Sequence, residues 1–504
     1  MSNRLQFISS VPEPDGASDH APDREGDRPL VWAPGETRDQ ACDRAPDWVK
    51  DSIIYEVFPE RFSNGDPIND PGNACSWTGL PSRGNFYGGD LQGIIDRLDY
   101  LDDLGVTCLY LTPVFAAPSN HKYDTVDHFR VDPAFGTDAV LADLARRLHA
   151  RGMRLILDAV FAHVGDGHPA FQDVLARGEA SPYRRWFKID GFPVRRRPRP
   201  NYRACGGLAS MPKLNAEDPE VQDFLCRVGV HWLRTADIDG WRLDMPWEIP
   251  HSFWRSFRAA VKSLKPEAFL FGELWGDAAP WLRGDQFDSA MNYRWRDIVL
   301  RFLVTQCVDA RTFVRELYSL RRAYGAASET MVNLLGSHDT PRLLTVCRGQ
   351  VGKAVQALAL LLTDVGVPML YYGDEIGLTG GNDPGCRGAM PWSRDKWNMH
   401  IYESCRALMR ARHQHPALRR GDFRLLIVSG RVLVFVRRWQ EDAVLVALNA
   451  GFQQERLEVR LPDMMCFRPL ETWHSPVPGH ECRIDSSRAR LVLPPSGTCL
   501  VLTA

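Results

Sequence analysis

The segment Gly240–Met245, GWRLDM, places a cation and a carboxylate two positions apart on a short apolar run. Side chains at this spacing on a β-strand point to the same face, so Arg242 and Asp244 would enter the same space. A buried ion pair would explain the pattern, but such a pair often adds little net stability. Because a neighbouring guanidinium favours the ionised carboxylate, we expect Arg242 to keep Asp244 charged and able to act as a nucleophile.

Other residues capable of acid/base chemistry also follow apolar runs. They are Asp158, His163, Glu273, His338 and Asp339. A single acid after a strand is more often a helix cap than a catalyst. When acids follow several strands whose ends meet at one place, a catalytic role becomes the better explanation. Carboxylates with Arg and His suit chemistry on a neutral polyol. Cleavage of a glycosidic bond needs one acid to protonate the leaving oxygen and a second carboxylate to meet the oxocarbenium-like carbon.

Short apolar runs alternate with amphipathic stretches, and these elements must position the acids. Seven runs are clear and an eighth, near Ser289–Arg294, is weaker; the clear ones are 52–58, 108–114, 154–161, 240–245, 268–275, 331–338 and 367–377. In the stretches between them, apolar residues recur every three or four positions, as in helices. The alternation predicts an α/β fold, a (β/α)8 barrel whose active site lies at the carboxyl ends of the strands.

Three segments depart from this alternation. Residues from about 164 to 214 contain no βα unit, which predicts an insertion subdomain after the third strand, over the barrel mouth. Residues 421–504 form short alternating runs without helices, which predicts a C-terminal antiparallel β-sandwich. Residues 1–47 are rich in Pro, Asp, Gly and Arg, and we expect a poorly ordered tail before the barrel at 48–420.

The composition restricts the class of partner. The chain has 504 residues and a net charge of −2, so no overall field attracts nucleic acid or an anionic membrane. The longest apolar stretch, 354–372, is interrupted by Asp364, Gly366 and Pro368, unlike a membrane span. The 12 cysteines form no C-x-x-C pair. We expect no secretory signal, because residues 1–16 have neither a basic region nor a long apolar run. We therefore expect a cytoplasmic protein with reduced thiols and a neutral ligand.

Four segments resemble the active-site segments of the α-amylase superfamily of glycoside hydrolases. They are DAVFAH (158–163), GWRLD (240–244), GELW (272–275) and LLGSHD (334–339). The resemblance implies that Asp244 is the nucleophile, that Glu273 is the general acid and then base, and that Asp339 grips the sugar hydroxyls. Contacts with the substrate are expected at Tyr123, Asp158, His163, Arg242, Trp247, Glu248, Trp275, His338, Asp383 and Arg387.

Four further segments resemble the neopullulanase, cyclomaltodextrinase and maltogenic amylase subfamily: PSNHKYDT (118–125), MPKLN (211–215), WLRGDQFD (281–288) and GDEIGLTGGNDPGCR (373–387). This resemblance implies a retaining hydrolase of α-1,4 bonds in cyclodextrins and maltooligosaccharides, with some α-1,6 or transfer activity. Asp383 and Arg387 would hold the second glucose on the non-reducing side. The subfamily's N-terminal β-sandwich module is expected to be lacking, because only 47 residues precede the barrel. We expect a monomer or homodimer.

The resemblance also implies a structural calcium ion. In NGDPIND (64–70), several hard oxygen donors lie within one turn, as Ca²⁺ requires. Taken alone, an ordinary turn rich in Asn and Asp would explain the segment better. With the resemblance, the expected calcium residues are Asn64, Asp66, Asn69, Asp70, Gly88 and Asp90.

Two alternatives remain open from the sequence. One is a specialised α-glucan transglycosylase or a hydrolase of another cyclic glucan. The other, from a different class, is a non-catalytic sugar-binding scaffold with an amylase-like fold. Such scaffolds lack parts of the acid set, whereas Asp244, Glu273 and Asp339 are all present, so catalysis is favoured.

Overall fold

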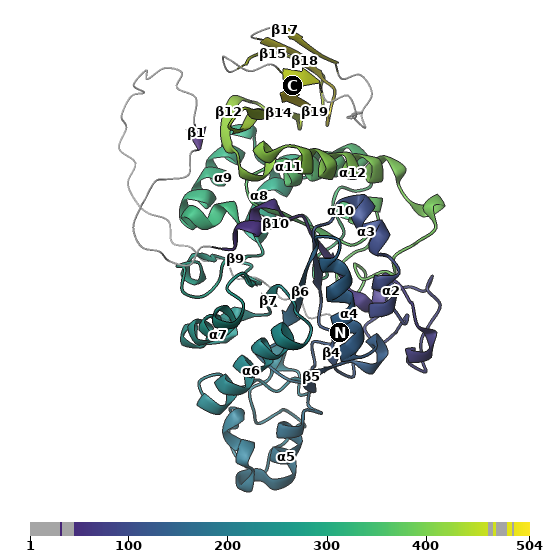
Figure 1. Ribbon diagram of the computed structural model, residues 1–504, viewed down its shortest axis with the longest axis vertical. Helices are drawn as coiled ribbons and strands as arrows, with labels where there is room; N and C mark the ends of the chain where they lie inside the picture. Colours follow the sequence, from purple (N-terminus) through teal and green to yellow (C-terminus); the bar gives the residue numbers. More distant parts are fainter. Residues whose placement is uncertain (1–30, 33–44, 462–466, 470–480, 486–487, 504) are drawn as a thin grey trace.

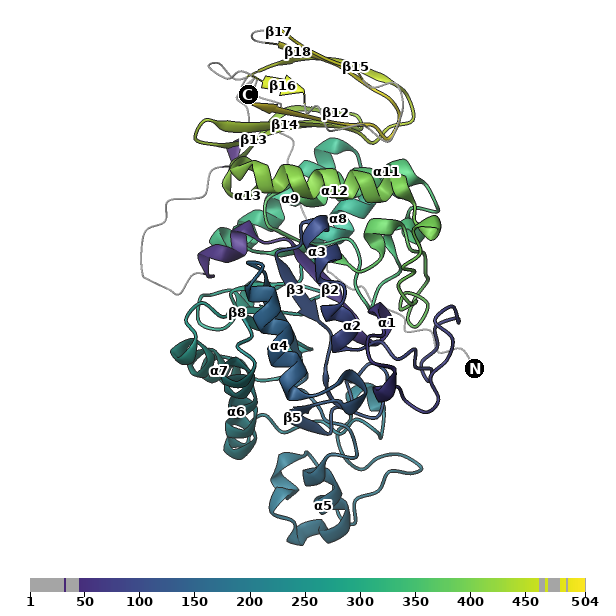
Figure 2. The same cartoon turned by 45° about the vertical axis from the view of Figure 1, so that its right-hand side comes forward.

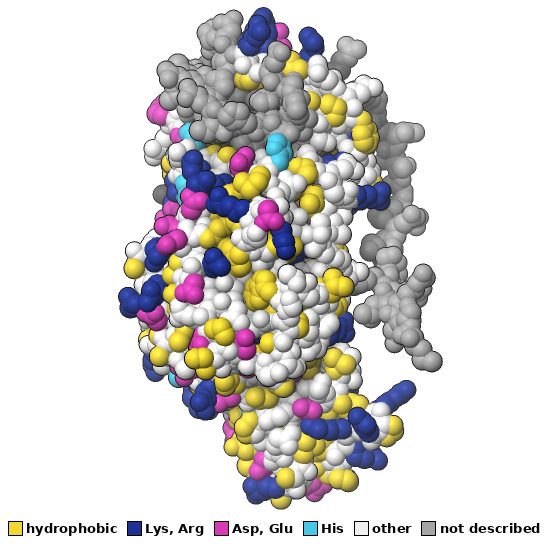
Figure 3. Space-filling view, turned by 90° about the vertical axis from the view of Figure 1, so that its right-hand side faces the viewer, with side chains coloured by type: hydrophobic (Ala, Val, Ile, Leu, Met, Phe, Trp, Pro, Cys, Tyr) yellow, Lys and Arg dark blue, Asp and Glu magenta, His cyan; other side chains and the backbone are white. Residues whose placement is uncertain are grey.

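The computed structural model describes residues 31–32, 45–461, 467–469, 481–485 and 488–503. An α/β barrel forms the middle of the molecule, a β domain lies at one end, and the insertion that carries α5 (Pro169–Arg177) projects at the other (Figure 1). Figure 3 shows the insertion as a narrower lobe, and acidic and basic side chains alternate over this face of the barrel. Within the described residues, no helix is long and apolar enough to cross a bilayer.

Eight parallel strands form the barrel, in the order β10-β11-β2-β3-β6-β7-β8-β9. They are β2 (Ile54–Val57), β3 (Cys108–Leu111), β6 (Arg154–Ala159), β7 (Gly240–Leu243), β8 (Phe269–Gly272), β9 (Ser289–Ala290), β10 (Val332–Leu334) and β11 (Val367–Tyr371). A parallel bridge between Met291 and Val332 closes the ring. Every strand residue except Arg154 is buried, because helices and the barrel interior cover both faces. The predicted barrel, with its short eighth strand, is confirmed.

Helices surround the strands, and they begin and end at the expected residue types. Thr137 caps α4 by accepting the Val140 N–H, and Gly105 ends α3 with a left-handed φ of 96°. The helices before the C-terminal domain, besides α5, are α1 (Pro59–Phe62), α2 (Leu91–Ile95), α3 (Leu98–Leu104), α4 (Asp138–His149), α6 (Pro219–Thr235), α7 (His251–Leu264), α8 (Tyr293–Leu303), α9 (Ala310–Tyr324), α10 (Leu343–Val346), α11 (Val351–Thr363), α12 (Met399–Gln414) and α13 (Pro416–Arg420).

One connection departs from the predicted alternation. Between β8 and β9 the chain forms only a 3-10 turn, Ala279–Trp281. Pro280 lies inside this turn and Gly284 has a left-handed φ of 92°, so neither favours a continued helix. The next helix, α8, therefore starts only after β9.

The insertion follows the third barrel strand, as predicted. Apart from α5 it consists of 3-10 turns and single bridges, of which His163–Lys213 joins its two ends. A separate small hairpin, β4 (Phe115–Ala116) and β5 (Asp127–Val131), follows β3. Because His163 comes just after β6, the bridge fixes the insertion at the carboxyl ends of the strands.

The C-terminal domain is the predicted antiparallel sandwich. One sheet has the order β1-β12-β13-β14-β19-β16 and the other β15-β18-β17. Their strands are β1 (Val31–Trp32), β12 (Asp422–Ser429), β13 (Val432–Trp439), β14 (Asp442–Asn449), β15 (Glu455–Arg460), β16 (Phe467–Pro469), β17 (Glu481–Asp485), β18 (Arg488–Leu493) and β19 (Thr498–Thr503). Strand β1 lies within the predicted tail 1–47, yet it pairs with β12. Most of that predicted tail lies outside the described residues.

Helices α11 and α12 lie between the barrel and this domain (Figure 2). Buried polar side chains join the two parts across that layer. Arg437 of β13 donates to the carbonyls of Thr363 (2.7 Å), Gly421 (2.9 Å) and Asp422 (3.1 Å). Gln356 of α11 donates to the carbonyl of Asn449 at 3.0 Å. The joint therefore depends on backbone carbonyls that need buried donors.

We predict that Arg437→Met destabilises the protein. The change removes the Arg437 donor from one buried carbonyl, that of Thr363, and from two partly buried ones, those of Gly421 and Asp422. This loss should lower the free energy of unfolding by about 2–4 kcal/mol. Denaturant unfolding measures this loss. The matched control is Arg438→Met, at the exposed neighbouring position, which should change the same free energy by less than about 0.5 kcal/mol. Equal effects of the two substitutions would contradict the prediction.

Candidate active site

Strand register places four polar side chains on the inner face of the barrel. Glu56 of β2 is the partner of Tyr110 of β3, and Asp158 of β6 is the partner of Arg242 of β7. Two residues earlier on each strand, the inner face is apolar, as at Ile156. Because side chains two apart share a face, a polar layer lies directly above an apolar one.

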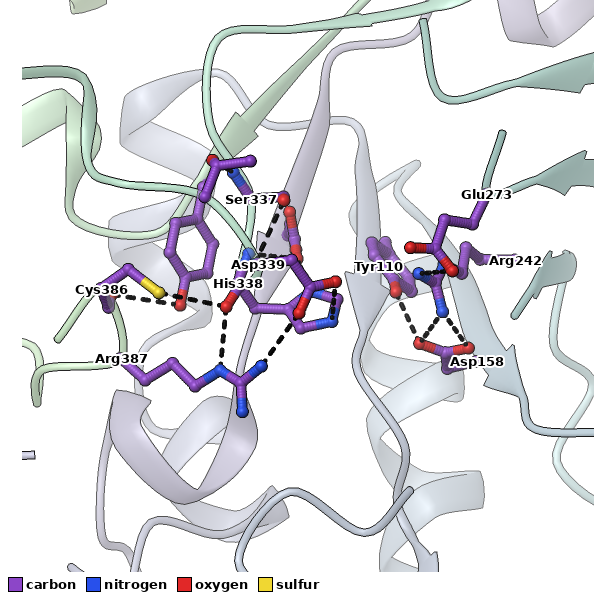
Figure 4. A network of polar contacts seen from close by, with 12 residues as sticks. Tyr110, Asp158, Arg242, Glu273, Ser337, His338, Asp339, Cys386 and Arg387 are labelled. Carbon is purple, nitrogen blue, oxygen red and sulfur yellow. Dashed lines mark hydrogen bonds and ion pairs between the residues drawn. The ribbon is translucent and has the colours of Figure 1, made fainter. Parts of the chain in front are cut away.

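The buried guanidinium of Arg242 contacts three carboxylates. Its Nη1 contacts Asp158 Oδ1 at 2.9 Å and Asp244 Oδ1 at 2.7 Å, and its Nη2 lies 3.1 Å from Glu273 Oε2. Asp158 also accepts a 2.7 Å hydrogen bond from Tyr110 Oη. Figure 4 shows Arg242 between Asp158 and Glu273. The guanidinium thus brings together acids from three strand ends.

The electrostatics at Asp244 differ from the prediction that Arg242 keeps it charged. Burial raises the pKa of Asp244 well above its usual range, and the carboxylates of Glu273 and Asp158 add to the rise. Arg242 lowers that pKa, as predicted, but its single charge is shared among three acids. Burial likewise raises the pKa of Asp158. Burial and the neighbouring acids therefore oppose ionisation of Asp244, and Arg242 offsets only part of this effect.

Glu273 is fixed by two neighbouring donors. The Met245 N–H donates to Oε2 at 3.2 Å, and the Trp275 indole donates to Oε1 at 2.8 Å. Met245 has a left-handed φ of 41°, an unfavourable conformation for a residue other than Gly, Asn or Asp. The Trp275 ring stacks on Tyr293 with centroids 3.7 Å apart. Trp275, predicted as a substrate contact, therefore orients the acid.

A second network surrounds Asp339. His338 Nε2 lies 3.1 Å from Asp339 Oδ2, and His338 Nδ1 lies 2.6 Å from Glu56 Oε1. Arg387 donates to Asp339 Oδ1 at 2.9 Å and to the His338 carbonyl at 2.8 Å. Figure 4 shows this network beside the Arg242 cluster.

The charges in this network stabilise one another. Burial opposes a charged His338, but the carboxylates of Asp339 and Glu56 raise its pKa to about 10. Burial also opposes ionisation of Asp339, yet His338 and Arg387 hold the pKa of that carboxyl well below its usual range. At neutral pH the network therefore presents an ionised Asp339 beside an imidazolium.

The two networks open into one cavity of about 400 Å³. Of the predicted site residues, Tyr123, His163, Asp244, Glu273, His338, Asp339, Asp383 and Arg387 line it. Asp158 and Arg242 are buried beneath the floor, and Trp247, Glu248 and Trp275 lie outside the lining. Residues not predicted also line it: Arg61, Ser82, Arg83, Asn120, His121, Cys205, Met211, Met245 and Pro384. The motifs at 118–125 and 211–215 contained three of these, whereas nothing local marked Arg61 or Arg83.

The remaining predicted contacts have distinct surroundings. Tyr123 Oη lies 2.9 Å from Asp158 Oδ2 and 2.7 Å from His338 Nε2. Burial lowers the pKa of His163 to about 4, so it is neutral, and its ring nitrogens have no hydrogen-bond partner among the described residues. Trp247 is 43% exposed, while Glu248 pairs with Lys213 at 2.7 Å. The cavity thus offers a neutral imidazole to a polar ligand.

The six predicted calcium residues lie together beside α2. Asp90 Oδ2 accepts from the Asp66 N–H (2.8 Å) and from Asn69 Nδ2 (3.2 Å), and Asn64 Nδ2 donates to Asp70 at 2.7 Å. The amide oxygens of Asn64 and Asn69 are buried without a partner among the described residues. A Cβ on Gly88 would lie 2.2 Å from Asp70 Oδ1. The described residues contain no cluster of three His, Cys, Asp or Glu suited to a metal.

We predict that Glu56→Gln lowers the pKa of His338, because one of the two carboxylates that stabilise the imidazolium is lost. NMR titration of the labelled imidazole should show a fall of about one unit or more. A folded-state pKa above the unfolded value near 6.5 stabilises the fold fully at low pH, and this stabilisation is lost as pH rises through about 10. The substitution should therefore cost more stability at pH 6 than at pH 10.5.

The control is Glu267→Gln at an exposed position, which should leave the His338 titration unchanged. An unaltered titration in Glu56→Gln would contradict the assignment of Glu56 as a stabilising partner.

Comparison with known proteins agrees with this geometry. The α-amylase catalytic domain model matches residues 56–420. The chain is 50% identical over 423 residues to a cyclomaltodextrinase of Geobacillus thermopakistaniensis (strain MAS1), covering 83% of this chain and 72% of that protein. It is 44% identical over 422 residues to an intracellular maltogenic amylase of Bacillus subtilis, covering 83% and 71%.

Among solved structures, the cyclic α-maltosyl-(1→6)-maltose hydrolase of Arthrobacter globiformis, in complex with that sugar, has a TM-score of 0.83 and 42% identity. The match covers 91% of this chain and 100% of that one. The predicted resemblance is confirmed. The chain belongs to the α-amylase family, and it is an α-glucan glycoside hydrolase of the cyclomaltodextrinase, maltogenic amylase and neopullulanase type.

Proposed function

We propose that the enzyme is a retaining hydrolase of α-1,4 bonds in which Asp244 is the nucleophile and Glu273 the general acid and base. The observation that carries this proposal is the pairing of Asp244 and Glu273 with the two terminal nitrogens of one guanidinium. Acids held by one fork lie close together, and retaining enzymes place their carboxyl groups about 5 Å apart. An inverting enzyme needs a wider gap for water.

The first step breaks the glycosidic bond. Asp244 attacks the anomeric carbon while the Glu273 carboxyl gives its proton to the leaving oxygen, which leaves as a hydroxyl. The Met245 N–H and the Trp275 indole hold the Glu273 carboxyl in place for this role. In the second step the Glu273 carboxylate takes a proton from water, the water oxygen bonds to the anomeric carbon, and the bond to Asp244 breaks.

Asp339 and its neighbours grip the sugar. As an ionised acceptor beside an imidazolium and a guanidinium, Asp339 can bind hydroxyls of the reacting glucose. Its partners are fixed before substrate arrives, so little reorganisation is needed as positive charge develops on the ring. His163, neutral and facing the cavity, supplies a further contact to a hydroxyl.

We propose cyclodextrins and maltooligosaccharides as the substrates, by similarity to the cyclomaltodextrinase and maltogenic amylase. A second candidate is a cyclic glucan of maltosyl units joined by α-1,6 bonds, because the match to the hydrolase of that sugar covers 91% of this chain and 100% of that one. Trp247, exposed beyond Asp244, offers an aromatic surface to a leaving-group or acceptor sugar. The intracellular name of the Bacillus relative supports a cytoplasmic location.

We also propose a structural calcium ion at the turn 64–70. The amide oxygens of Asn64 and Asn69 are buried and accept no hydrogen bond from the part of the chain that the structure describes. With the adjacent Asp70 carboxylate they supply the hard oxygen donors that Ca²⁺ prefers. When bound, the ion would neutralise the carboxylates of this turn and brace the start of α2. It takes no part in the chemistry at Asp244.

We predict that two substitutions separate the catalytic roles. Glu273→Gln should lower hydrolysis of β-cyclodextrin by about 10²–10⁴-fold because the acid is lost. With an aryl maltoside whose leaving group needs no protonation, Glu273→Gln should keep most of the wild-type rate of the first step. Asp244→Asn should not, because the nucleophile is lost. Stopped-flow release of the phenol measures this difference.

The matched control is Asp285→Asn, a partly exposed acid paired with Arg255, which should retain full activity. Comparison of β-cyclodextrin, pullulan and starch as substrates tests the specificity. Unchanged turnover in Asp244→Asn would refute the proposed mechanism.

We predict that calcium stabilises the fold without changing catalysis. Saturating Ca²⁺ should raise the melting temperature by several degrees, as expected for a ligand that binds only the folded state, and EDTA should reverse the rise. A double substitution, Asn64→Ala with Asn69→Ala, should abolish the response. A melting temperature that changes with neither Ca²⁺ nor EDTA would contradict the proposal of a calcium site at this turn.

A further inference from the structure

A series of ion pairs crosses the cavity rim on the side away from Glu273. Arg387, which contacts Asp339, also places Nη1 3.0 Å from Asp383 Oδ1. Asp383 Oδ2 in turn lies 3.3 Å from Arg83 Nη2. Figure 4 shows Arg387 and Glu273 on opposite sides of the site. The series therefore joins the connection after β11 to the connection between β2 and β3, over the end of the cavity.

The backbone around Arg83 is held by two buried side chains. Asn120 Nδ2 donates to the carbonyls of Asn85 (2.7 Å) and Arg83 (3.3 Å). Arg61 Nη2 donates to the carbonyls of Asn85 (3.1 Å) and Ser82 (3.4 Å). Both donors are almost fully buried. The loop is thus anchored from below, independently of the Arg83 side chain.

The Arg83 side chain itself is 78% exposed, and an exposed ion pair contributes little by itself. Its position over the cavity therefore follows from the anchored backbone, with Asp383 orienting the guanidinium. Arg83 lines the same cavity as Asp244 and Asp339. A substrate that extends past Asp383 would meet this guanidinium.

We propose that Arg83, paired with Asp383, is a specificity-determining residue that closes the glycone side of the cavity and limits the length of the released product. This inference rests on the proposed function, in which Glu273 protonates the leaving group. The leaving group then lies beside Glu273, so the glycone lies beside Asp339, Arg387 and Asp383. A glycone that extends beyond Asp383 then meets Arg83.

The test compares Arg83→Ala with the wild-type enzyme on maltoheptaose labelled at its reducing end. The wild type should release one short glycone and therefore one long labelled aglycone, which chromatography detects. The variant should raise the ratio of shorter to longer labelled aglycones about tenfold or more, because longer glycones fit once the Arg83 side chain is removed. Maltotriose is too short to reach Arg83, so its turnover by the variant should stay within about twofold of the wild-type value.

Two further variants sharpen the comparison. Asn120→Ala releases the loop without altering the guanidinium and should shift the products in the same direction. Arg130→Ala, at an exposed arginine outside the cavity lining, should leave them unchanged. Melting curves of each variant confirm that it is folded.

The outcomes separate the two proposals. If Arg83→Ala leaves the product pattern and maltotriose turnover unchanged, Arg83 does not limit product length, and the proposed function is unaffected. Loss of maltotriose turnover in a folded Arg83→Ala would also contradict the proposed role of Arg83 in product length, because Arg83 would then bind the reacting sugars themselves. A wild-type enzyme that cleaves neither substrate would overturn the proposed function instead.

Discussion

The catalytic centre depends on one buried guanidinium. A cation inside a barrel is costly unless charged partners surround it, and Arg242 has three, Asp158, Asp244 and Glu273. The dependence runs both ways, since without Arg242 the same acids would repel one another across a region from which water is excluded. Asp158 is outside the lining of the catalytic cavity, yet by sharing this cation it helps to fix Asp244. The ion cluster is thus both a structural joint between strand ends and the source of the site's protonation behaviour.

A second set of charges holds the opposite side of the site, and the two sets are connected. His338 balances Asp339 and Glu56, while the Tyr123 hydroxyl contacts both Asp158 and His338. The donors and acceptors are therefore oriented through strands β2, β3, β6 and β7 before any ligand binds. Preorganisation of this kind is what lets a polar site stabilise charge without rearranging.

Loops outside the barrel decide the shape of the cavity. Arg83 comes from the β2–β3 connection, Cys205 and Met211 from the insertion, and Asp383 from the connection after β11. Because the strands fix only the floor, these connections can change the accepted glucan without disturbing the acids. The joint between the barrel and the C-terminal domain lies at the other end and leaves the cavity open.

The sequence by itself determined the barrel, the sandwich and the acids at the strand ends, because apolar periodicity and strand-end residues such as Asp158 and Asp339 are local signals. Tertiary structure alone decided that Arg242 is shared among three acids and that Trp275 orients Glu273. It also decided that β1 joins the C-terminal sheet and that Arg83 lines the cavity. Burial and contacts between distant segments set pKa values and cavity walls, and neither quantity is encoded in the spacing of residues along the chain.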